Sequence, residues 1–247
     1  MNNNNTNEHY DNLANNYDEL WFYSEGYVNK LTNEIIKIID LSVDDKFVDL
    51  GCGTGIYSKS ILKEIDLKKK IICSDISKKM IEQAKKNIFA EFRTVSALEF
   101  SKKPIKYDKL LIKEVIHHIE KKEELIRNIY TQLNEKGICL ILLLPPKIEY
   151  PLFKKAIELY EKNQPDYKDI SMILRNEGFD VEEKEISIPL SIPKAKYFNM
   201  IENRYMSLLS DFSEKEIHTG ISSLRKKYNN RKNLNFNDRF IALKGSK

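Results

Sequence analysis

Short apolar runs alternate with amphipathic segments along most of the chain. Five runs have the length and composition of strands, at residues 46–50, 70–74, 91–95, 107–112 and 137–143. Between them, apolar residues recur at helical spacing in 56–65, 78–88 and 122–134. This alternation predicts a parallel sheet with helices on both faces. The continuously apolar run from Ile138 to Leu143 is typical of a strand buried on both sides.

Helical patterns flank this alternation at both ends of the chain. Within residues 10–40, Leu31, Ile35 and Ile39 recur at helical spacing and predict N-terminal helices. Beyond the prolines at 145 and 146, the pattern predicts helices at 152–163 and 166–177, a strand at 181–188, helices at 195–209 and 213–228, and a last strand at 235–243. Residues 189–233 are therefore expected to form a helical insertion before the last strand, and its second helix begins with a Ser213–Glu216 capping box.

Neither an internal repeat nor a Gly/Ser-rich linker divides the chain. Its 247 residues, 41% of them hydrophobic, are enough for one sizeable core, so we expect a single domain over residues 1–247. Residues 1–8 are polar and rich in asparagine, which predicts a disordered tail and not a secretory signal. The longest apolar run, Ile138 to Leu144, is too short to span a membrane.

Charge and cysteine content bear on the class of partner and on the cellular location. The chain carries 41 Lys and Arg against 37 Asp and Glu, and the net charge of +4 permits an anionic partner without requiring one. The three cysteines at 52, 73 and 139 are scattered and lack CxxC spacing, which argues against a disulfide scaffold or a zinc site. The sequence therefore predicts a reduced, cytoplasmic location.

A glycine-rich turn follows the first predicted strand. Glycines stand at 51, 53 and 55, and a strand, a glycine turn and a helix N-terminus together form a cradle for a small ligand. The dinucleotide fingerprint is excluded because Ile56 holds the slot of its third glycine, and no Gly-Lys-Ser/Thr follows as in a phosphate loop. Asp75 ends the second strand, where a carboxylate can bind a ribose diol. Asp49 before the turn would repel a pyrophosphate but not a cationic ligand.

Three motifs in order carry a family resemblance. They are Asp49-Leu50-Gly51-Cys52-Gly53-Thr54-Gly55, Asp75-Ile76-Ser77-x-x-Met80-Ile81 and Tyr107-Asp108…His117-His118-Ile119. With them, residues 10 to about 145 resemble the class I S-adenosylmethionine-dependent methyltransferases. The opening Tyr10-Asp11-x-x-Ala14-x-x-Tyr17-Asp18 is similar to the lid of the small-molecule, type-11-like branch, so residues 10–40 and 189–233 are expected to form lids. The resemblance implies a Rossmann-like three-layer α/β sandwich with a mostly parallel seven-stranded sheet and an antiparallel last strand.

The resemblance also implies a set of contacts to S-adenosylmethionine and its product S-adenosylhomocysteine. The residues concerned are Tyr17, Asp49, Gly51, Cys52, Gly53, Asp75, Ile76, Met80, Ser96, Ala97 and Lys113. Gly51 and Gly53, on either side of Cys52, would let the backbone meet the methionine part of the cofactor, and Asp49 would hold its ammonium group, directly or through water. Lys113 would lie next to this end of the cofactor, and Tyr17 would close over it. Asp75 would bind the ribose, with Ile76 and Met80 against the adenine. Ser96-Ala97 replaces the usual Asp-Ala pair, so the adenine amine would lose a charge-assisted hydrogen bond.

The cofactor's sulfonium is already activated, so the protein needs mainly to align an acceptor in line with the methyl group for SN2 transfer. His117 follows the fourth strand and is the candidate general base, because its unperturbed pKa suits proton transfer. Alternatively, His117 packs or contacts a ligand without moving a proton. A metal site of Glu114, His117 and His118 is disfavoured because the second glutamate of related metal-binding members is missing, and we expect no metal.

The candidate substrate contacts lie in the two expected lids and beside His117. They are Tyr23, Tyr27, His118, Arg204 and Tyr205. Aromatic walls and an arginine would suit a small molecule with an acidic group. The simpler interpretation is ordinary helix packing, with Arg204 paired to a surface glutamate.

These observations favour an enzyme that methylates oxygen or nitrogen, including a carboxylate oxygen, of a small molecule. A tRNA or rRNA methyltransferase is the nearest alternative, and nucleic acid is disfavoured because no RNA-binding module, zinc cluster or Asn/Asp-Pro-Pro-Tyr motif is present. A protein methyltransferase and a non-catalytic cofactor-binding partner subunit are further alternatives. We expect no membrane association, and a monomer or a homodimer.

Overall fold

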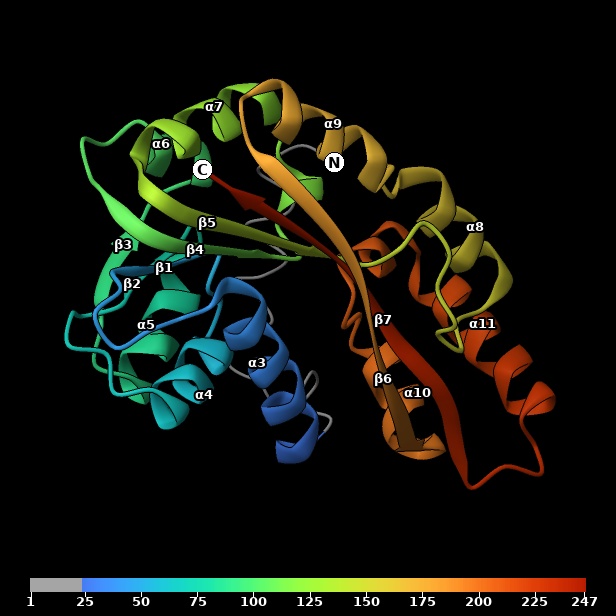
Figure 1. Cartoon of the computed structure of the whole chain (residues 1–247). Coiled ribbons are helices and arrows are strands. Elements are labelled where there is room, and N and C mark those ends of the chain that lie inside the picture. The colour runs from blue at the N-terminus through green and yellow to red at the C-terminus, as the bar shows by residue number, and fades with distance from the viewer. Residues whose placement is uncertain (1–23) are drawn as a thin grey trace.

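The computed structural model describes residues 24–247. One seven-stranded sheet runs through it in the order β3-β2-β1-β4-β5-β7-β6 (Figure 1). The strands are β1 Phe47–Leu50, β2 Ile72–Asp75, β3 Glu91–Thr94, β4 Tyr107–Lys113, β5 Leu133–Leu143, β6 Asp180–Pro193 and β7 Asn233–Ser246. The first five pair in parallel, and β7 pairs antiparallel with both β5 and β6. The predicted Rossmann-like fold class is confirmed.

Helices cover both faces of the sheet (Figure 1). One face carries α3 Glu25–Ile39, α4 Ile56–Glu64 and α5 Lys78–Asn87, and the other carries α6 Ala97–Ser101, α7 Lys122–Gln132 and α9 Tyr167–Asn176. Strand β5 shows why the sheet needs both layers. Its residues Ile138, Leu140 and Leu142 belong to one core, whereas Cys139, Ile141 and Leu143 belong to the other. Successive side chains of a strand point to opposite faces, so a run apolar at every position is buried on both sides.

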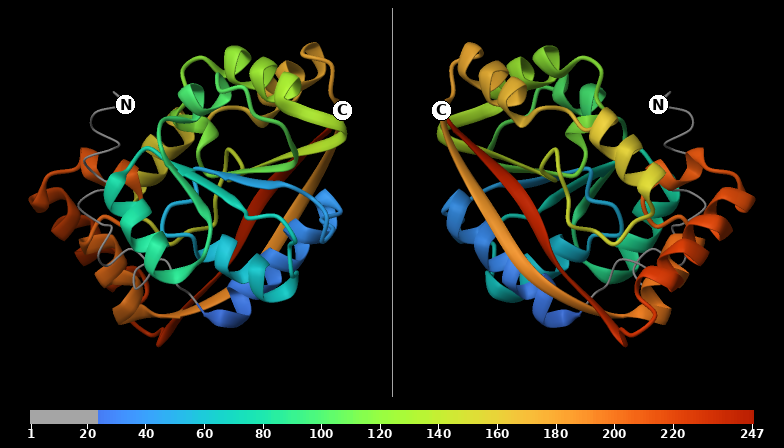
Figure 2. Two further views of the ribbon diagram at one scale, coloured as in Figure 1. Left: turned by 90° about the vertical axis from the view of Figure 1, so that its left-hand side faces the viewer. Right: turned by 90° about the vertical axis from the view of Figure 1, so that its right-hand side faces the viewer.

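The last two strands form a long hairpin that extends beyond the sheet. β6 and β7 pair from Asp180↔Ser246 to Pro193↔Asn233, but β5 pairs with β7 only over residues 241–246. The outer part of the hairpin therefore projects as a two-stranded ribbon (Figure 2). Helix α10 Lys194–Glu202, the 3₁₀ helix η2 Ser207–Asp211 and helix α11 Glu214–Lys227 connect its two strands. We call residues 186–240 the arm.

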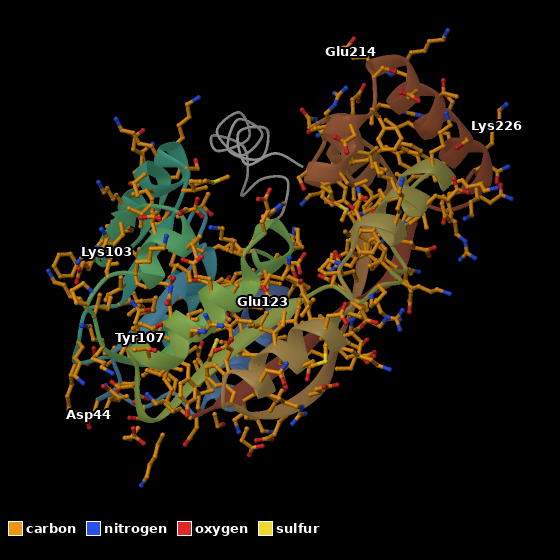
Figure 3. The ribbon with its side chains drawn as sticks, turned by 90° about the horizontal axis from the view of Figure 1, so that it is seen from above. Asp44, Lys103, Tyr107, Glu123, Glu214 and Lys226 are labelled. Carbon is orange, nitrogen blue, oxygen red and sulfur yellow. The ribbon has the colours of Figure 1, made fainter. Side chains whose placement is uncertain are left out.

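The arm stands apart from the β1–β3 side of the sheet. Seen from above, Glu214 and Lys226 mark the two ends of α11 on one side of the molecule, whereas Lys103 and Asp44 lie on the other (Figure 3). Helix α8, Lys154–Asn163, runs beside α11 (Figure 1). Insertions outside the carboxyl ends of parallel strands commonly build the ligand site of such folds.

The arm corrects two of the predicted boundaries. Residues 189–193 continue β6, so the helical insertion begins at Lys194 and not at residue 189. Ile188, Leu190 and Ile192 alternate inward along this stretch, and Pro189 and Pro193 face outward on an edge strand, where proline is tolerated. The single helix expected at 195–209 ends at Glu202, because Arg204 adopts a left-handed φ of 52°.

Other local predictions are confirmed. Ser213 caps α11 through a full capping box with Glu216, and α8 and α9 fall within one or two residues of the predicted ranges. Helix α6 was not predicted, because five residues are too few to show a helical period. The expected tail at 1–8 and the first part of the 10–40 segment lie outside the described residues. No helix among residues 24–247 is long and apolar enough to cross a membrane.

Candidate functional site

The glycine turn joins β1 to α4 at the carboxyl edge of the sheet. Gly51, Gly53 and Gly55 have φ values of 84°, 55° and 77°, in the left-handed region that glycine adopts readily. The backbone N–H groups of Gly51 and Cys52 donate to the Ser74 carbonyl oxygen at 2.7 and 3.0 Å. These bonds hold the turn against the end of β2. The Cys52 side chain is buried beneath it.

Two of these glycines are required for different reasons. A Cβ atom on Gly51 would lie 2.1 Å from Val115 Cγ2, so this position is needed for close packing against the segment after β4. A Cβ on Gly53 would have no heavy atom within 4 Å. The turn therefore leaves open space over Gly53, where a ligand can approach the backbone.

The carboxyl group of Asp49 lies beneath this turn and is almost completely buried. Ser58 Oγ donates to its Oδ2 at 2.5 Å. The pKa of Asp49 is raised to about 6, chiefly by burial and also by the charge of Asp75, against the opposing effects of Ser58 and Lys113. The charged form of Asp49 is therefore incompletely compensated, and a cation above the turn would stabilise it.

Asp75 lies at the end of β2 with its carboxylate in a fixed orientation. Oδ2 accepts from the Gly53 N–H at 2.9 Å, and Oδ1 accepts from the Ser77 N–H at 2.8 Å. A carboxylate oxygen can accept more than one hydrogen bond, so both oxygens can also receive ribose hydroxyls. The adjacent Ile76 side chain is 42% exposed, whereas Met80 is buried. Of the two predicted adenine contacts, Ile76 offers the exposed apolar surface.

The predicted Ser96-Ala97 pair lies next to Asp75 at the same edge. The Val95 N–H donates to the Asp75 carbonyl oxygen at 3.1 Å, which fixes the start of this segment. Ser96 Oγ caps α6 by accepting from the Glu99 N–H at 3.2 Å, and Ala97 is buried. The Ser96 hydroxyl thus has a structural task in the described chain.

A second group of polar side chains lies between the glycine turn and the arm. We call it the acid–tyrosine cluster, and it consists of Tyr27, Tyr57, Lys113, Glu114, Tyr150 and Asp238. Asp238, on β7, is only 1% exposed. Tyr150 donates to its Oδ1 at 2.5 Å, and Tyr27 donates to its Oδ2. Burial raises the pKa of Asp238, although both hydroxyls and Lys113 oppose this.

Glu114 and Lys113 end β4 within this cluster. Glu114 has a left-handed φ of 56°, and its Oε1 accepts from the Leu144 N–H at 2.7 Å. Burial raises the pKa of Glu114 to about 7, with Asp238 adding to the shift and Lys113 opposing it. Lys113 Nζ lies 4.8 Å from the centre of the Tyr57 ring and 4.9 Å from that of Phe240.

Tyr57 connects the two groups of residues. It belongs to the first turn of α4, directly after the glycine turn, and a hydrogen bond with Tyr27 lowers its pKa against the stronger opposite effect of burial. Tyr27 in turn donates to Asp238. The path from the glycine turn to the arm is therefore continuous.

His117 and His118 lie in the 3₁₀ helix η1, Ile116–His118, after β4. Their ring centres are 3.9 Å apart. His117 Nδ1 is buried and has no hydrogen-bond partner among the described residues. Burial, with help from His118 and Lys122, holds the pKa of His117 well below its usual range, so the ring is neutral at pH 7. No group of three metal-ligating side chains is present in residues 24–247.

The predicted substrate residues do not lie at one place in the structure. Tyr27 joins the acid–tyrosine cluster. Tyr205 is buried inside the arm, where its hydroxyl lies 2.9 Å from that of Tyr197, and burial raises its pKa. The simpler expectation for Arg204 was an ion pair with a surface glutamate. Instead, its guanidinium group donates to the Phe212 carbonyl oxygen at 3.1 Å. Tyr17 and Tyr23 lie outside the described residues.

Sequence reasoning missed Asp238, Tyr150 and Tyr57. A signal for Asp238 was present, because it shares the inward-facing positions of β7 with Leu234, Phe236 and Phe240. A carboxylate in a row of buried apolar side chains needs polar partners. Its partners come from segments as far as 211 residues away, so no local pattern identified them.

Comparison with known proteins identifies the family. A sequence family described as a methyltransferase domain matches residues 41–205. The chain belongs to this methyltransferase family. Its methyltransferase domain is of the S-adenosylmethionine-dependent kind, as the resemblance implied.

Individual relatives are distant. Phosphoethanolamine N-methyltransferase 3 of Arabidopsis thaliana is 24% identical over 83% of the chain, which spans only 44% of that protein's length. Ribosomal RNA small subunit methyltransferase H of Ureaplasma parvum is 26% identical to this chain. The match covers 84% of this chain and 62% of the Ureaplasma protein. The structure of Haemonchus contortus phosphoethanolamine N-methyltransferase 2, with phosphomonomethylethanolamine and S-adenosylhomocysteine, aligns with a TM-score of 0.63 at 19% identity, over 96% of this chain and 57% of that one.

The methyltransferase cofactor fits the groups present in this structure. The open position over Gly53 admits a ligand close to the backbone. The buried carboxyl of Asp49 suits an ammonium group, and the oriented carboxylate of Asp75 suits a ribose diol.

The different surroundings of the two glycines predict different consequences of adding a methyl group. Gly51→Ala should lower the free energy of unfolding by about 2–4 kcal/mol, from the clash with Val115 and the left-handed backbone. Gly53→Ala should cost only about 1–2 kcal/mol but weaken S-adenosylhomocysteine binding at least tenfold. Urea unfolding and calorimetry measure both. Wild-type affinity in Gly53→Ala would contradict the placement of the ligand.

The buried carboxyl of Asp49 predicts a trade-off between stability and binding. Because folding raises its pKa from 3.8 to about 6, the folded state loses stability as pH rises through this window and carries the full penalty above it. Asp49→Asn should therefore be more stable than wild type by about 1–3 kcal/mol at pH 8, with the gain vanishing near pH 4. It should also bind S-adenosylhomocysteine more weakly. Asp66→Asn, an exposed carboxyl change, is the control and should alter neither property.

Proposed function

We propose that the enzyme transfers the methyl group of S-adenosylmethionine to oxygen or nitrogen of a small molecule. The observation that carries this proposal is the continuity between the glycine turn and the acid–tyrosine cluster through Tyr57. The turn and Asp75 supply a nucleoside site, and the cluster supplies polar groups and aromatic rings directly beside it. An acceptor held there would lie next to the methionine end of the cofactor.

The cofactor contacts follow from this placement. Asp75 binds the ribose hydroxyls, Ile76 packs against the adenine with Met80 behind it, and Ser96-Ala97 lies at the adenine edge. Gly51, Cys52 and Gly53 face the methionine part, with Asp49 at its ammonium group and Lys113 nearby. Tyr17, expected to close over this end, lies outside the described residues.

The bound cofactor supplies an electrophilic methyl group on a sulfonium, so the chain needs to align the acceptor and exclude water. His117 Nδ1 has no partner among the described residues, so His117 is the proposed base, although burial lowers its pKa and makes it a weaker base than a free imidazole. Tyr27, His118, Arg204 and Tyr205, with Tyr23 outside the described residues, are the proposed acceptor contacts. The cytoplasmic location and the monomeric or homodimeric state stay predictions.

Methylation of RNA is the second candidate, and one surface feature favours it. Five exposed basic residues gather at the far end of the arm, at Arg225, Lys226, Lys227, Arg231 and Lys232. None forms an ion pair with another described residue within 4.0 Å. Such a patch suits phosphate contacts. The Ureaplasma relative named above acts on ribosomal RNA.

A thermal-shift screen separates the two candidates. The protein with S-adenosylhomocysteine is heated with single metabolites or with short single-stranded RNA, because a true acceptor adds stability by mass action. Stabilisation by a metabolite supports the small-molecule proposal, and stabilisation by RNA alone overturns it. Methyl transfer to the stabilising compound, followed by mass spectrometry, then identifies the acceptor atom.

The cofactor assignment predicts the effect of removing the Asp75 carboxylate. Asp75→Ala should weaken S-adenosylhomocysteine binding by about 1–3 kcal/mol, because the ribose hydroxyls lose their acceptor. Calorimetry measures the change, and Asp66→Ala is the exposed control. Unchanged affinity in Asp75→Ala would overturn the cofactor site.

The assignment of His117 as a base predicts a separation of turnover from affinity. His117→Ala should lower kcat at least tenfold while leaving the Kd of S-adenosylhomocysteine within about twofold, because the ring acts on the acceptor and not on the cofactor. His117→Gln, which keeps a polar side chain but no basic nitrogen, should behave in the same way. If both variants keep wild-type kcat, His117 has only a packing role.

A further inference from the structure

The carboxyl edge of the sheet holds more buried acid than base. Asp49, Glu114 and Asp238 are carboxyl groups whose pKa is raised by burial, and Lys113 is the cation that opposes each shift. One cation therefore serves three buried carboxyl groups in the described residues. Arg239, the next residue on β7, pairs instead with Glu149 and Glu185 on the outer side of the arm.

Lys113 does not neutralise its neighbours by direct contact. Its Nζ lies between the rings of Tyr57 and Phe240, and it forms no ion pair within 4.0 Å of a described carboxylate. The ring faces share its charge through cation–π attraction. Its effect on Asp238 and Glu114 is therefore long-range.

Asp238 is held by groups from two distant segments. Tyr27 from α3 and Tyr150 from the segment after β5 both donate to its carboxylate. Phe236, two residues away on the same face of β7, packs edge-on against Tyr150 at 5.3 Å and against Tyr197 at 5.5 Å. A fixed carboxylate is thus surrounded by aromatic rings, which is the environment that binds alkylammonium groups.

We propose that the acid–tyrosine cluster binds the positively charged nitrogen of the acceptor, which is therefore an aliphatic amine. A protonated amine has no lone pair, so this nitrogen gives its proton to His117, the base proposed above, before it forms the new N–C bond; the bond between the methyl group and the cofactor's sulfur breaks in the same step, and the product nitrogen is charged again. This inference rests on the proposed function and selects nitrogen from the oxygen and nitrogen acceptors considered there. The cofactor's ammonium group would offset Asp49, and the acceptor's nitrogen would offset the Asp238 and Glu114 side. A carboxylate acceptor would add a further negative charge to this edge. N-methylation leaves the product nitrogen able to carry a positive charge, so the cluster suits both substrate and product.

Two probes of equal shape test the charge of the acceptor. Choline and 3,3-dimethylbutan-1-ol differ in that the second has carbon in place of the cationic nitrogen. Each is titrated into the wild-type protein saturated with S-adenosylhomocysteine, and binding is followed by calorimetry or ligand-observed NMR. We expect choline to bind at least tenfold more tightly than the alcohol. Equal affinity, or no binding of choline, overturns the inference.

Variants locate the binding to the cluster. Asp238→Asn keeps the shape of the side chain and should abolish the preference for choline. Glu182→Gln, an exposed carboxyl change on β6 beside β7, is the matched control and should retain it. If Asp238→Asn does not fold, Tyr150→Phe removes one hydrogen bond to the same carboxylate and should reduce the preference severalfold, with Tyr130→Phe on the opposite face of the sheet as its control. A preference that survives in the cluster variants overturns the assignment.

The binding of S-adenosylhomocysteine distinguishes a failure of the proposed function from a failure of the amine inference alone. If the wild-type protein does not bind it, the proposed function fails and this inference fails with it. If it binds and methyl transfer occurs only to an alcohol, phenol or carboxylate, the enzyme activity stands and the amine inference alone is overturned.

Discussion

The buried charge of Asp49 is the constraint on which the rest of the site depends. A carboxyl group at the end of β1, almost fully removed from water, is held by one hydroxyl and a distant lysine. A fold keeps such a group at a cost, because water would solvate the charged form better. The cost has a use if a cationic ligand completes the site. The glycine turn directly above Asp49, with open space at Gly53, provides access for that ligand.

A second buried carboxyl group, that of Asp238, lies in the arm. The hairpin of β6 and β7 continues past the sheet, and its inward face carries Asp238 toward Tyr27 and Tyr150. These hydrogen bonds tie α3, the segment after β5 and the last strand into one structure. Because Tyr57 lies in the first turn of the helix after the glycine turn, a change at the proposed cofactor position can affect the proposed acceptor position through Tyr27. Binding of cofactor and binding of acceptor are therefore expected to be coupled.

Much of the fold was predictable because its signals are local. Strand–helix alternation and the apolar run of β5 reflect periods of two and of about four residues, which a short window reveals. The arm was predicted less well. Ile188, Leu190 and Ile192 continue the strand period past Pro189, which is tolerated there because β6 is an edge strand. Arg204 ends α10 by a left-handed conformation that has no glycine to mark it.

The sequence by itself determined the half of the site that we propose for the cofactor. Asp49, the three glycines and Asp75 lie at the ends of adjacent parallel strands, and such strand ends always meet at one edge of the sheet. Only the tertiary structure decided the other half. Asp238, Tyr27 and Tyr150 are brought together across as many as 211 residues, and the pairing depends on the length and direction of the final hairpin. Local periodicity shows that Asp238 faces inward, but burial among distant partners gives that carboxylate its charge environment.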